Sequence, residues 1–419
     1  MRLGPRKKKG SMSVTSPVTP RKSTVKLRKK EKTEVKEEKT EVKEEKVEVK
    51  EEKAEVKEEV MVPKKGKRST PKKSSQSVPA QRVSDLASLI SSVAKKHGEG
   101  SLIQMNRAAI KDVKTISSGS LGLDYSLGIG GYPRGRIVEI YGPSAAGKST
   151  LTLHAIAECQ KSGGIAAFID AEHALDLKYA RQLGVNTEDL LFSQPDYGEQ
   201  ALDIVLEILK ANIVDLVVVD SVAALTPKSE IDGDMEQRHV GLQARMMSQA
   251  LRKLTAIVSK TDTCLIFINQ IREKVGVMWG SNEVTPGGRG LKFYCSVRVD
   301  VRRVSSIKKG DSILGNRVKT KISKNKLAPP HRECQFDIIF GKGINSHGDL
   351  VDIACDYGLI EKSGSWFSYK GIQLGQGRDS AIKFVEGDQE IKNEIETTLR
   401  NDLFGNNINE DNRNSGEGG

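Results

Sequence analysis

Gly142-Pro-Ser-Ala-Ala-Gly147-Lys148-Ser149 has the spacing G-x-x-x-x-G-K-[ST] and predicts a triphosphate-binding loop. The apolar run Ile137–Tyr141 before it is typical of a buried strand. The run Thr150–Glu158 after it contains neither Pro nor Gly and is typical of a helix. This order brings backbone N–H groups and the positive end of a helix around phosphate oxygens, Lys148 adds a cation, and Ser149 offers a hydroxyl to Mg²⁺. The residues expected to hold the nucleotide here are Gly142, Pro143, Ser144, Ala145, Ala146, Gly147, Lys148, Ser149 and Thr150.

The net charge of +12 belongs entirely to the first 80 of the 419 residues. Those residues contain 25 Lys and Arg against 13 Asp and Glu, whereas positions 81–419 contain 42 of each kind. The basic composition therefore describes an N-terminal arm. Any nucleic-acid binding by the rest of the chain must come from local patches.

Residues 32–59 of this arm are four copies of the seven-residue unit K-[TVA]-E-V-K-E-E. Each copy offers one or two apolar residues, too little for a stable coiled coil to offset the entropy of ordering. We therefore expect residues 1–81 to be a disordered basic arm. Its flanks, rich in Lys, Arg, Ser and Pro, suit either non-specific phosphate binding or a solvated tether, and the sequence leaves both open.

The cysteine pattern and the lack of targeting signals indicate a cellular location. Five widely spaced cysteines, with no C-x-x-C pair and no His at zinc spacing, are typical of a reducing compartment. The sequence has no apolar run of the length, about 18 residues, that spans a membrane, and no apolar core of a secretory signal. Glutamates from position 31 onward argue against a transit peptide. We expect a soluble cytoplasmic protein without a membrane partner.

The character of the chain changes at Arg82. Apolar residues from Val83 to Val93 fall on one helical face, which needs a partner surface, so we expect residues 82–110 to hold an N-terminal helix for packing between protomers. Five apolar runs then alternate with helical patterns and predict an α/β fold, a mostly parallel central sheet covered by helices. We expect this sheet to form a nucleotide-binding core over residues 111–344, followed by a small α/β domain over 345–400 and a disordered tail over 401–419. The five runs are 137–141, 166–170, 216–220, 265–269 and 297–301.

Polar side chains end or follow three of these runs, at the sheet edge where ligands gather in open parallel sheets. Asp220 is expected to help hold Mg²⁺ beside Ser149, the alternative being a helix cap. Glu172, just past the neighbouring strand, is placed to orient or deprotonate a water that attacks the γ-phosphate. Gln270 is placed to sense the γ-phosphate and to pull on the loop that follows it.

Two stretches are candidates for phosphate binding by flexible loops. The first, Ile271–Gly290, is long and rich in glycine and contains Arg272. The second, Ile231–Val240, leads into a helix on which Arg245 and Arg252 share a face. Ordinary solvated surface would explain these arginines equally well.

Several stretches together resemble the bacterial RecA recombinase family, over about residues 82–400. They are Gly142–Thr150, Asp170–Asp176, Val218–Leu225, Gly241–Lys253, Phe267–Arg272, Lys324–Lys326 and Leu359–Trp366. A ring-forming helicase motor shares the nucleotide loop, but the Lys324–Lys326 stretch and the C-terminal block argue against it. A DNA-coating protein that acts through its arm is a third, non-enzymatic reading.

The resemblance implies a RecA-like P-loop ATPase whose subunits form a helical filament on single-stranded DNA. ATP and Mg²⁺ are held between subunits, and the filament pairs with homologous duplex DNA, exchanges strands in recombination and repair, and hydrolyses ATP when DNA is bound. A role in the SOS response, with a LexA-type repressor as a partner, is implied by the resemblance alone. The positions that match catalytic or nucleotide-binding residues of the family are Lys148, Glu172, Asp176, Tyr179, Gln270, Lys324 and Lys326, the last two reaching the nucleotide from the adjoining subunit. Tyr179 matches an aromatic that stacks on adenine, and Asp176 a residue beside that base.

The resemblance also assigns DNA-binding residues. Arg245, Arg252, Arg272, Gly287 and Gly288 match the primary DNA-binding loops. Arg302 and Arg303 match part of a secondary site for the incoming duplex. One departure lies in the phosphate loop, where Ser144-Ala-Ala146 replaces the common Glu-Ser-Ser; this removes polar side chains but leaves the backbone cradle. The basic arm is no part of the family pattern.

Overall fold

The computed structural model describes residues 80–99, 101–102, 113–234, 241–273 and 283–404, and the chain divides after Ile103 into two units. The expected arm over 1–81 and tail over 401–419 lie largely outside these residues. In the first unit, α2 (Ala80–His97) begins two residues before Arg82. Its Leu86 and Leu89 side chains are exposed.

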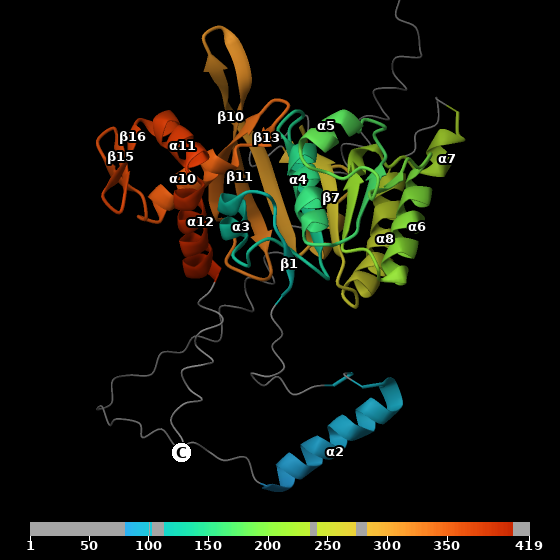
Figure 1. Ribbon diagram of the computed structural model, residues 1–419. Helices are drawn as coiled ribbons and strands as arrows, with labels where there is room; N and C mark the ends of the chain where they lie inside the picture. The colour runs from blue at the N-terminus through green and yellow to red at the C-terminus, as the bar shows by residue number, and fades with distance from the viewer. Residues whose placement is uncertain (1–79, 100, 103–112, 235–240, 274–282, 405–419) are drawn as a thin grey trace, which may run out of the picture. The chain divides into compact units, whose positions relative to one another are not determined.

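The second unit is built on a nine-stranded sheet in the order β13-β12-β11-β10-β3-β7-β6-β4-β5 (Figure 1). Neighbouring strands from β10 to β5 pair in parallel, which confirms the expected mostly parallel α/β sheet. All five apolar runs lie in this part of the sheet. The parallel strands are β3 (Ile137–Gly142), β4 (Ala166–Asp170), β5 (Leu191–Ser193), β6 (Leu216–Asp220), β7 (Cys264–Gln270) and β10 (Val297–Lys309).

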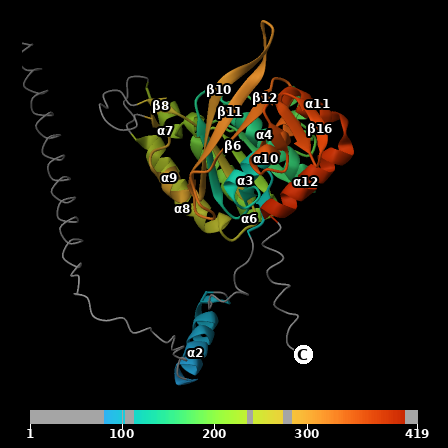
Figure 2. The same cartoon turned by 90° about the vertical axis from the view of Figure 1, so that its left-hand side faces the viewer.

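An antiparallel extension of the sheet was not expected from the sequence. It consists of β11 (Ser312–Asn325), β12 (Glu333–Ile339) and β13 (Gly343–Ile344). β10 continues past its expected end at 301 and reverses at Gly310, whose φ of +59° suits a tight turn. The β10–β11 hairpin extends beyond the rest of this unit in both views (Figures 1 and 2). Because β11 buries only scattered residues, it lacks the continuous apolar run that marks the inner strands.

The two faces of the sheet carry different helices. α4 (Lys148–Lys161) contributes to one hydrophobic core, and α6 (Gly198–Ala211) and α8 (Leu242–Val258) contribute to the other. On β3, Val138 and Ile140 join the α4 core and Ile137 joins the α6–α8 core, as the two-residue period of a strand requires. Burial on both faces explains the nearly continuous apolar runs.

Shorter elements connect the sheet and these helices. They are α3 (Leu121–Leu127), α5 (Leu177–Gln182), α7 (Lys228–Ile231), α9 (Gly290–Tyr294), a 3₁₀ turn (Val222–Ala224), β1 (Thr115–Ile116), β2 (Tyr132–Pro133), β8 (Arg272–Glu273) and β9 (Glu283–Val284). Among the described helices, none combines the length and apolar character needed to cross a bilayer.

A small C-terminal lobe lies at the opposite end of the sheet from α6 and α8 (Figure 1). It has a hydrophobic core of its own, to which α3 adds Leu121. Its last helix ends at Phe404, four residues beyond the expected domain end at 400, because Leu403 and Phe404 pack against that core. The lobe comprises α10 (Ser346–Asp356), β14 (Glu361–Ser363), β15 (Trp366–Tyr369), β16 (Ile372–Gln376), α11 (Arg378–Gly387) and α12 (Gln389–Phe404).

α3 carries a fully buried carboxylate, Asp124, which should make the stability of the fold depend on pH. Ser117 Oγ and Ser118 N donate to its oxygens at 2.6 and 2.8 Å, yet burial raises its pKa from 3.8 to about 7. The folded state therefore keeps a proton that the unfolded chain releases, and the free energy of unfolding should fall as pH rises from about 4 to about 7. Asp124→Asn should reduce this slope in denaturant unfolding at several pH values. An unchanged slope would contradict the raised pKa.

Candidate active site

The phosphate loop joins β3 to α4, and glycine is favoured at two of its positions, at Gly142 by a close backbone neighbour and at Gly147 by a positive φ. A Cβ at Gly142 would lie 2.1 Å from Val301 O, and one at Gly147 would lie 2.6 Å from Ile338 Cδ1. Gly147 has a φ of +97° and is the N-cap of α4, where it has no side chain to accept hydrogen bonds. The first N–H groups of α4 are therefore available to an anion.

Lys148 lies across this loop. The residue is buried, and its Nζ donates to Pro143 O at 2.8 Å. Burial lowers the pKa of Lys148, while the Asp220 and Glu172 carboxylates act in the opposite direction. The Lys148 ammonium and the N-terminal end of α4 both place positive charge beside the loop, so both favour an anion bound there.

Ser149 and Asp220 lie next to each other at the edge of the loop, and their expected role in holding Mg²⁺ stays a prediction. Ser149 Oγ donates to Asp220 Oδ2 at 2.7 Å. Burial raises the pKa of Asp220 to about 6, so the carboxylate is largely ionised at neutral pH. A hydroxyl and a carboxylate are oxygen ligands of the kind that Mg²⁺ accepts alongside phosphate and water. Among the described residues there is no cluster of three or more His, Cys, Asp or Glu that would hold a metal by protein ligands alone.

The structure brings together Glu172 and Gln270, which are 98 residues apart in the chain. Gln270 Nε2 donates to Glu172 Oε1 at 2.9 Å. Ser221 Oγ donates to the same carboxylate oxygen. Sequence analysis missed Ser221, because a serine directly after Asp220 carries no signal until the fold places Glu172 beside it. The carboxylates of Asp220 and Glu172 and the amide of Gln270 thus lie together at the end of the loop.

A cavity of about 220 Å³ opens beside the loop and has two aromatic residues in its lining. Tyr179 is fixed by a 3.1 Å hydrogen bond between its Oη and Thr150 Oγ1. Phe340 directly follows β12, and 56% of its surface is exposed. Asp176 caps α5 by accepting from Lys178 N and Tyr179 N, and it does not line the cavity. The lining residues are Ala145, Ala146, Gly147, Lys148, Ser149, Thr150, Tyr179, Asn316, Val318, Ile338 and Phe340.

Sequence analysis did not find Phe340 or Asn316. Both lie on the antiparallel strands or just after them, so they reach the phosphate loop only through sheet pairing that the sequence pattern did not predict. A large aromatic directly after an apolar run, in Asp337-Ile-Ile-Phe340, was the one available signal.

The residues expected to bind DNA differ in how exposed they are to solvent and in the partners that they already have. Arg245, Arg252 and Arg272 are exposed. Gly287 is buried, and its N–H is donated to a side chain of α8. Arg302 is held by the carboxylates of Glu283 and Asp300, whereas Arg303 is exposed. The loop residues 235–240 and 274–282 lie outside the described part of the chain.

Lys324 and Lys326 do not line the cavity beside the phosphate loop of their own chain. Lys324 Nζ donates to the carbonyl oxygens of Lys292 and Phe293 at 2.6 and 3.0 Å, at the C-terminal end of α9. Lys326 is exposed. Their expected contact with a nucleotide on another subunit stays a prediction.

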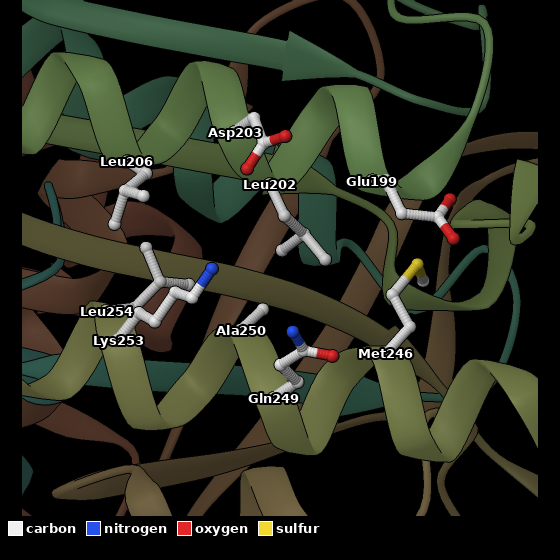
Figure 3. A pocket seen from close by; sticks show the side chains of 9 residues that line it. All are labelled: Glu199, Leu202, Asp203, Leu206, Met246, Gln249, Ala250, Lys253 and Leu254. Carbon is white, nitrogen blue, oxygen red and sulfur yellow. The ribbon is translucent and has the colours of Figure 1, made fainter.

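A second hollow, of about 210 Å³, lies between α6 and α8 (Figure 3). Leucine side chains from both helices face each other across it, and Met246 extends from α8 toward α6 (Figure 3). It lacks the glycine-rich backbone that distinguishes the phosphate loop, and its charged residues are Glu199, Asp203 and Lys253. The loop is therefore the stronger candidate for a nucleotide site.

Comparisons with known proteins point to one family. The model of the RecA N-terminal domain matches residues 84–345, and that of the RecA C-terminal domain matches residues 348–403. The chain belongs to the RecA family. Protein RecA of Wolinella succinogenes is 58% identical to it over 316 residues, which cover 75% of this chain and 90% of the relative. Protein RecA of Campylobacter jejuni subsp. jejuni serotype O:23/36 is 56% identical over 319 residues, which cover 76% and 93%.

A RecA chain is a DNA recombination and repair protein and a DNA-dependent ATPase, and the expected enzyme class and recognition are thereby confirmed. A crystal structure of the RadB recombinase aligns at a TM-score of 0.42 with 22% identity, covering 55% of this chain and 98% of RadB. A likeness with so low a TM-score supports no conclusion about this chain. The arm before residue 80 lies outside both domain matches.

Proposed function

We propose that ATP and Mg²⁺ bind at the phosphate loop and control how firmly this chain, as a filament, holds single-stranded DNA. The observation that supports this best is the contact of Gln270 with Glu172 beside the loop. It places a candidate general base next to the residue that leads into a candidate DNA-binding loop. Bound nucleotide can then favour one arrangement of that loop through differential affinity.

For hydrolysis, we assign Glu172 to the attacking water. The carboxylate accepts the water proton as the new bond to the γ-phosphorus forms and the bond to the β-phosphate oxygen breaks. Lys148 and the amides of the loop stabilise charge on the phosphates, and Ser149 with Asp220 would hold Mg²⁺, which neutralises phosphate charge when bound. Gln270 changes partner between Glu172 and the γ-phosphate.

The remaining parts of the proposal depend on assembly and on the family resemblance. Lys324 and Lys326 contact the nucleotide of the adjoining subunit, and the exposed apolar face of α2 packs on a neighbouring protomer. Asp176 lies beside the base. Single-stranded DNA and homologous duplex are the substrates of strand exchange, and the candidate contacts are Arg245, Arg252, Arg272, Gly287, Gly288, Arg302 and Arg303. We also propose a LexA-type repressor as a partner and a role in the SOS response. A cytoplasmic location agrees with the five free thiols among the described residues.

The aromatic wall of the cavity gives a prediction about the base. Tyr179 and Phe340 line the same cavity, so we propose that the purine stacks on both. Phe340→Ala should raise KM for ATP about tenfold and change kcat little, because stacking contributes similarly before and during reaction. Phe340→Tyr should retain the wild-type KM. A DNA-dependent ATPase titration measures both constants, and an unchanged KM in the alanine variant would remove Phe340 from the site.

The function is tested by ATP hydrolysis and strand exchange measured together. Single-stranded DNA should stimulate hydrolysis, and exchange should occur with homologous duplex but not with a scrambled one, because base pairing itself reads homology. Electron microscopy with a non-hydrolysable nucleotide separates the ring-motor alternative, which predicts closed rings. Stimulated hydrolysis without homology-dependent exchange would contradict the recombinase assignment.

A further inference from the structure

Gln243, in the first turn of α8, connects three segments through one side-chain amide. Its Nε2 donates to Val222 O at 2.9 Å and to Leu225 O at 3.2 Å. Its Oε1 accepts from Gly287 N at 3.2 Å. Only this orientation of the amide satisfies all three partners, because two are acceptors and one is a donor. The amide therefore holds α8, the 3₁₀ turn and the Gly287 turn in one arrangement.

The 3₁₀ turn leads directly from the nucleotide site. Its first residue, Val222, follows Asp220, which binds Ser149, and Ser221, which donates to Glu172. A displacement of these residues by bound nucleotide would therefore reach the carbonyls that Gln243 holds.

The Gly287 turn is tied to the nucleotide site by a second route. Asn269 Oδ1 accepts from Gln270 N at 3.0 Å, and Asn269 Nδ2 donates to Pro286 O at 3.1 Å. Gln270 is the residue that contacts Glu172. The residue before Gly287 is thus linked by Asn269 to the candidate γ-phosphate sensor.

The Gly287–Gly288 turn packs closely on the 3₁₀ turn and on α8. A Cβ at Gly287 would lie 2.6 Å from Val222 Cγ1, and one at Gly288 would lie 2.7 Å from Ala244 Cβ. In this arrangement the Gly287 N–H already has an acceptor, because it donates to Gln243 Oε1. An amide oxygen and a phosphate oxygen are acceptors of the same kind, so Gln243 takes the place that a DNA phosphate would need.

We propose that Gln243 is a positioning residue that holds the Gly287–Gly288 turn in a form unable to bind DNA until nucleotide is bound. This inference rests on the proposed function, in which that turn contacts the DNA backbone. When Gln270 leaves Glu172 for a γ-phosphate, Asn269 and Pro286 follow. The long Gly287–Gln243 hydrogen bond opens, and the Gly287 N–H turns to the DNA.

Two substitutions at Gln243 separate this role from a purely structural one. Gln243→Met removes all three hydrogen bonds at similar side-chain length. Gln243→Glu keeps an acceptor for Gly287 N but loses the donors to Val222 O and Leu225 O. Gln249→Met, at an exposed position on the same helix, is the matched control. The readout is the ratio of affinities for a labelled single-stranded oligonucleotide with and without a non-hydrolysable ATP analogue, measured by anisotropy on the full chain.

In Gln243→Met, affinity without nucleotide should rise about fivefold, because of the three lost hydrogen bonds only the one from Gly287 N competes with DNA. Affinity with the analogue should stay within about twofold. The ratio should fall accordingly, whereas Gln243→Glu and Gln249→Met should keep a ratio at least as large as that of the wild type. An unchanged ratio in Gln243→Met, or weaker binding in both states, would overturn the inference. Absence of nucleotide dependence in the wild type would instead overturn the proposed function.

Discussion

Lys148→Ala is expected to abolish nucleotide-dependent filament formation on single-stranded DNA. The substitution removes the buried ammonium that lies across the phosphate loop, and with it the charge-assisted contacts to the phosphates. Loss of several such contacts should lower the affinity for ATP by at least about 100-fold. Nucleotide binding and electron microscopy of DNA complexes with a non-hydrolysable analogue measure the two effects.

Lys161→Ala is the matched control for this variant. Lys161 lies at the far end of the same helix and forms a surface ion pair with Glu158, so its loss should leave filaments intact. If Lys148→Ala still forms filaments that require nucleotide, the assignment of the phosphate loop is wrong.

Glu172→Gln is expected to separate binding from hydrolysis. The glutamine retains an oxygen for the hydrogen bonds from Ser221 and Gln270 but cannot accept a proton from water at neutral pH. The kcat of DNA-dependent hydrolysis should fall about 100- to 1,000-fold, as expected for loss of a general base, while ATP and DNA affinities change little.

This expectation is tested by measuring steady-state ATP hydrolysis and, in the presence of ATP, oligonucleotide binding by Glu172→Gln and the wild type. Glu207→Gln, on the surface of α6 where the residue pairs with Lys210, should behave as the wild type. Unchanged turnover in Glu172→Gln would remove Glu172 from its proposed role. Loss of ATP binding would show instead that the residue is needed to build the site.

The inner part of the fold and the phosphate end of the site could be predicted from the sequence. β3, the loop and α4 lie next to one another in the chain, so local spacing was sufficient. Asp220, Glu172 and Gln270 were found because parallel strands bring their carboxyl ends to one edge. The contact of Ser149 with Asp220 and that of Gln270 with Glu172 agree with this reasoning.

What the sequence could not predict depends on pairing between distant, half-polar segments. β11 and β12 bury only part of their residues, so the sequence pattern did not identify them as strands. The residues that these strands add to the cavity lining, and Phe340 directly after β12, were therefore not predicted. Ser221 makes one side-chain hydrogen bond to Glu172, and Gln243 makes three to residues in other segments of the chain. Serine and glutamine form no sequence pattern that reveals such partners. The two carboxylates that hold Arg302 come from β9 and β10, so these ion pairs became visible only in the folded structure.

The central claim is that bound nucleotide sets how tightly this chain holds single-stranded DNA. The most direct test is the affinity of the full chain for an unstructured oligonucleotide, with and without a non-hydrolysable ATP analogue and Mg²⁺, over a series of salt concentrations. The salt series accounts for non-specific binding by the basic arm, which should weaken steeply with salt. We predict tighter binding with the analogue at every salt concentration, and equal binding with and without it would contradict the claim.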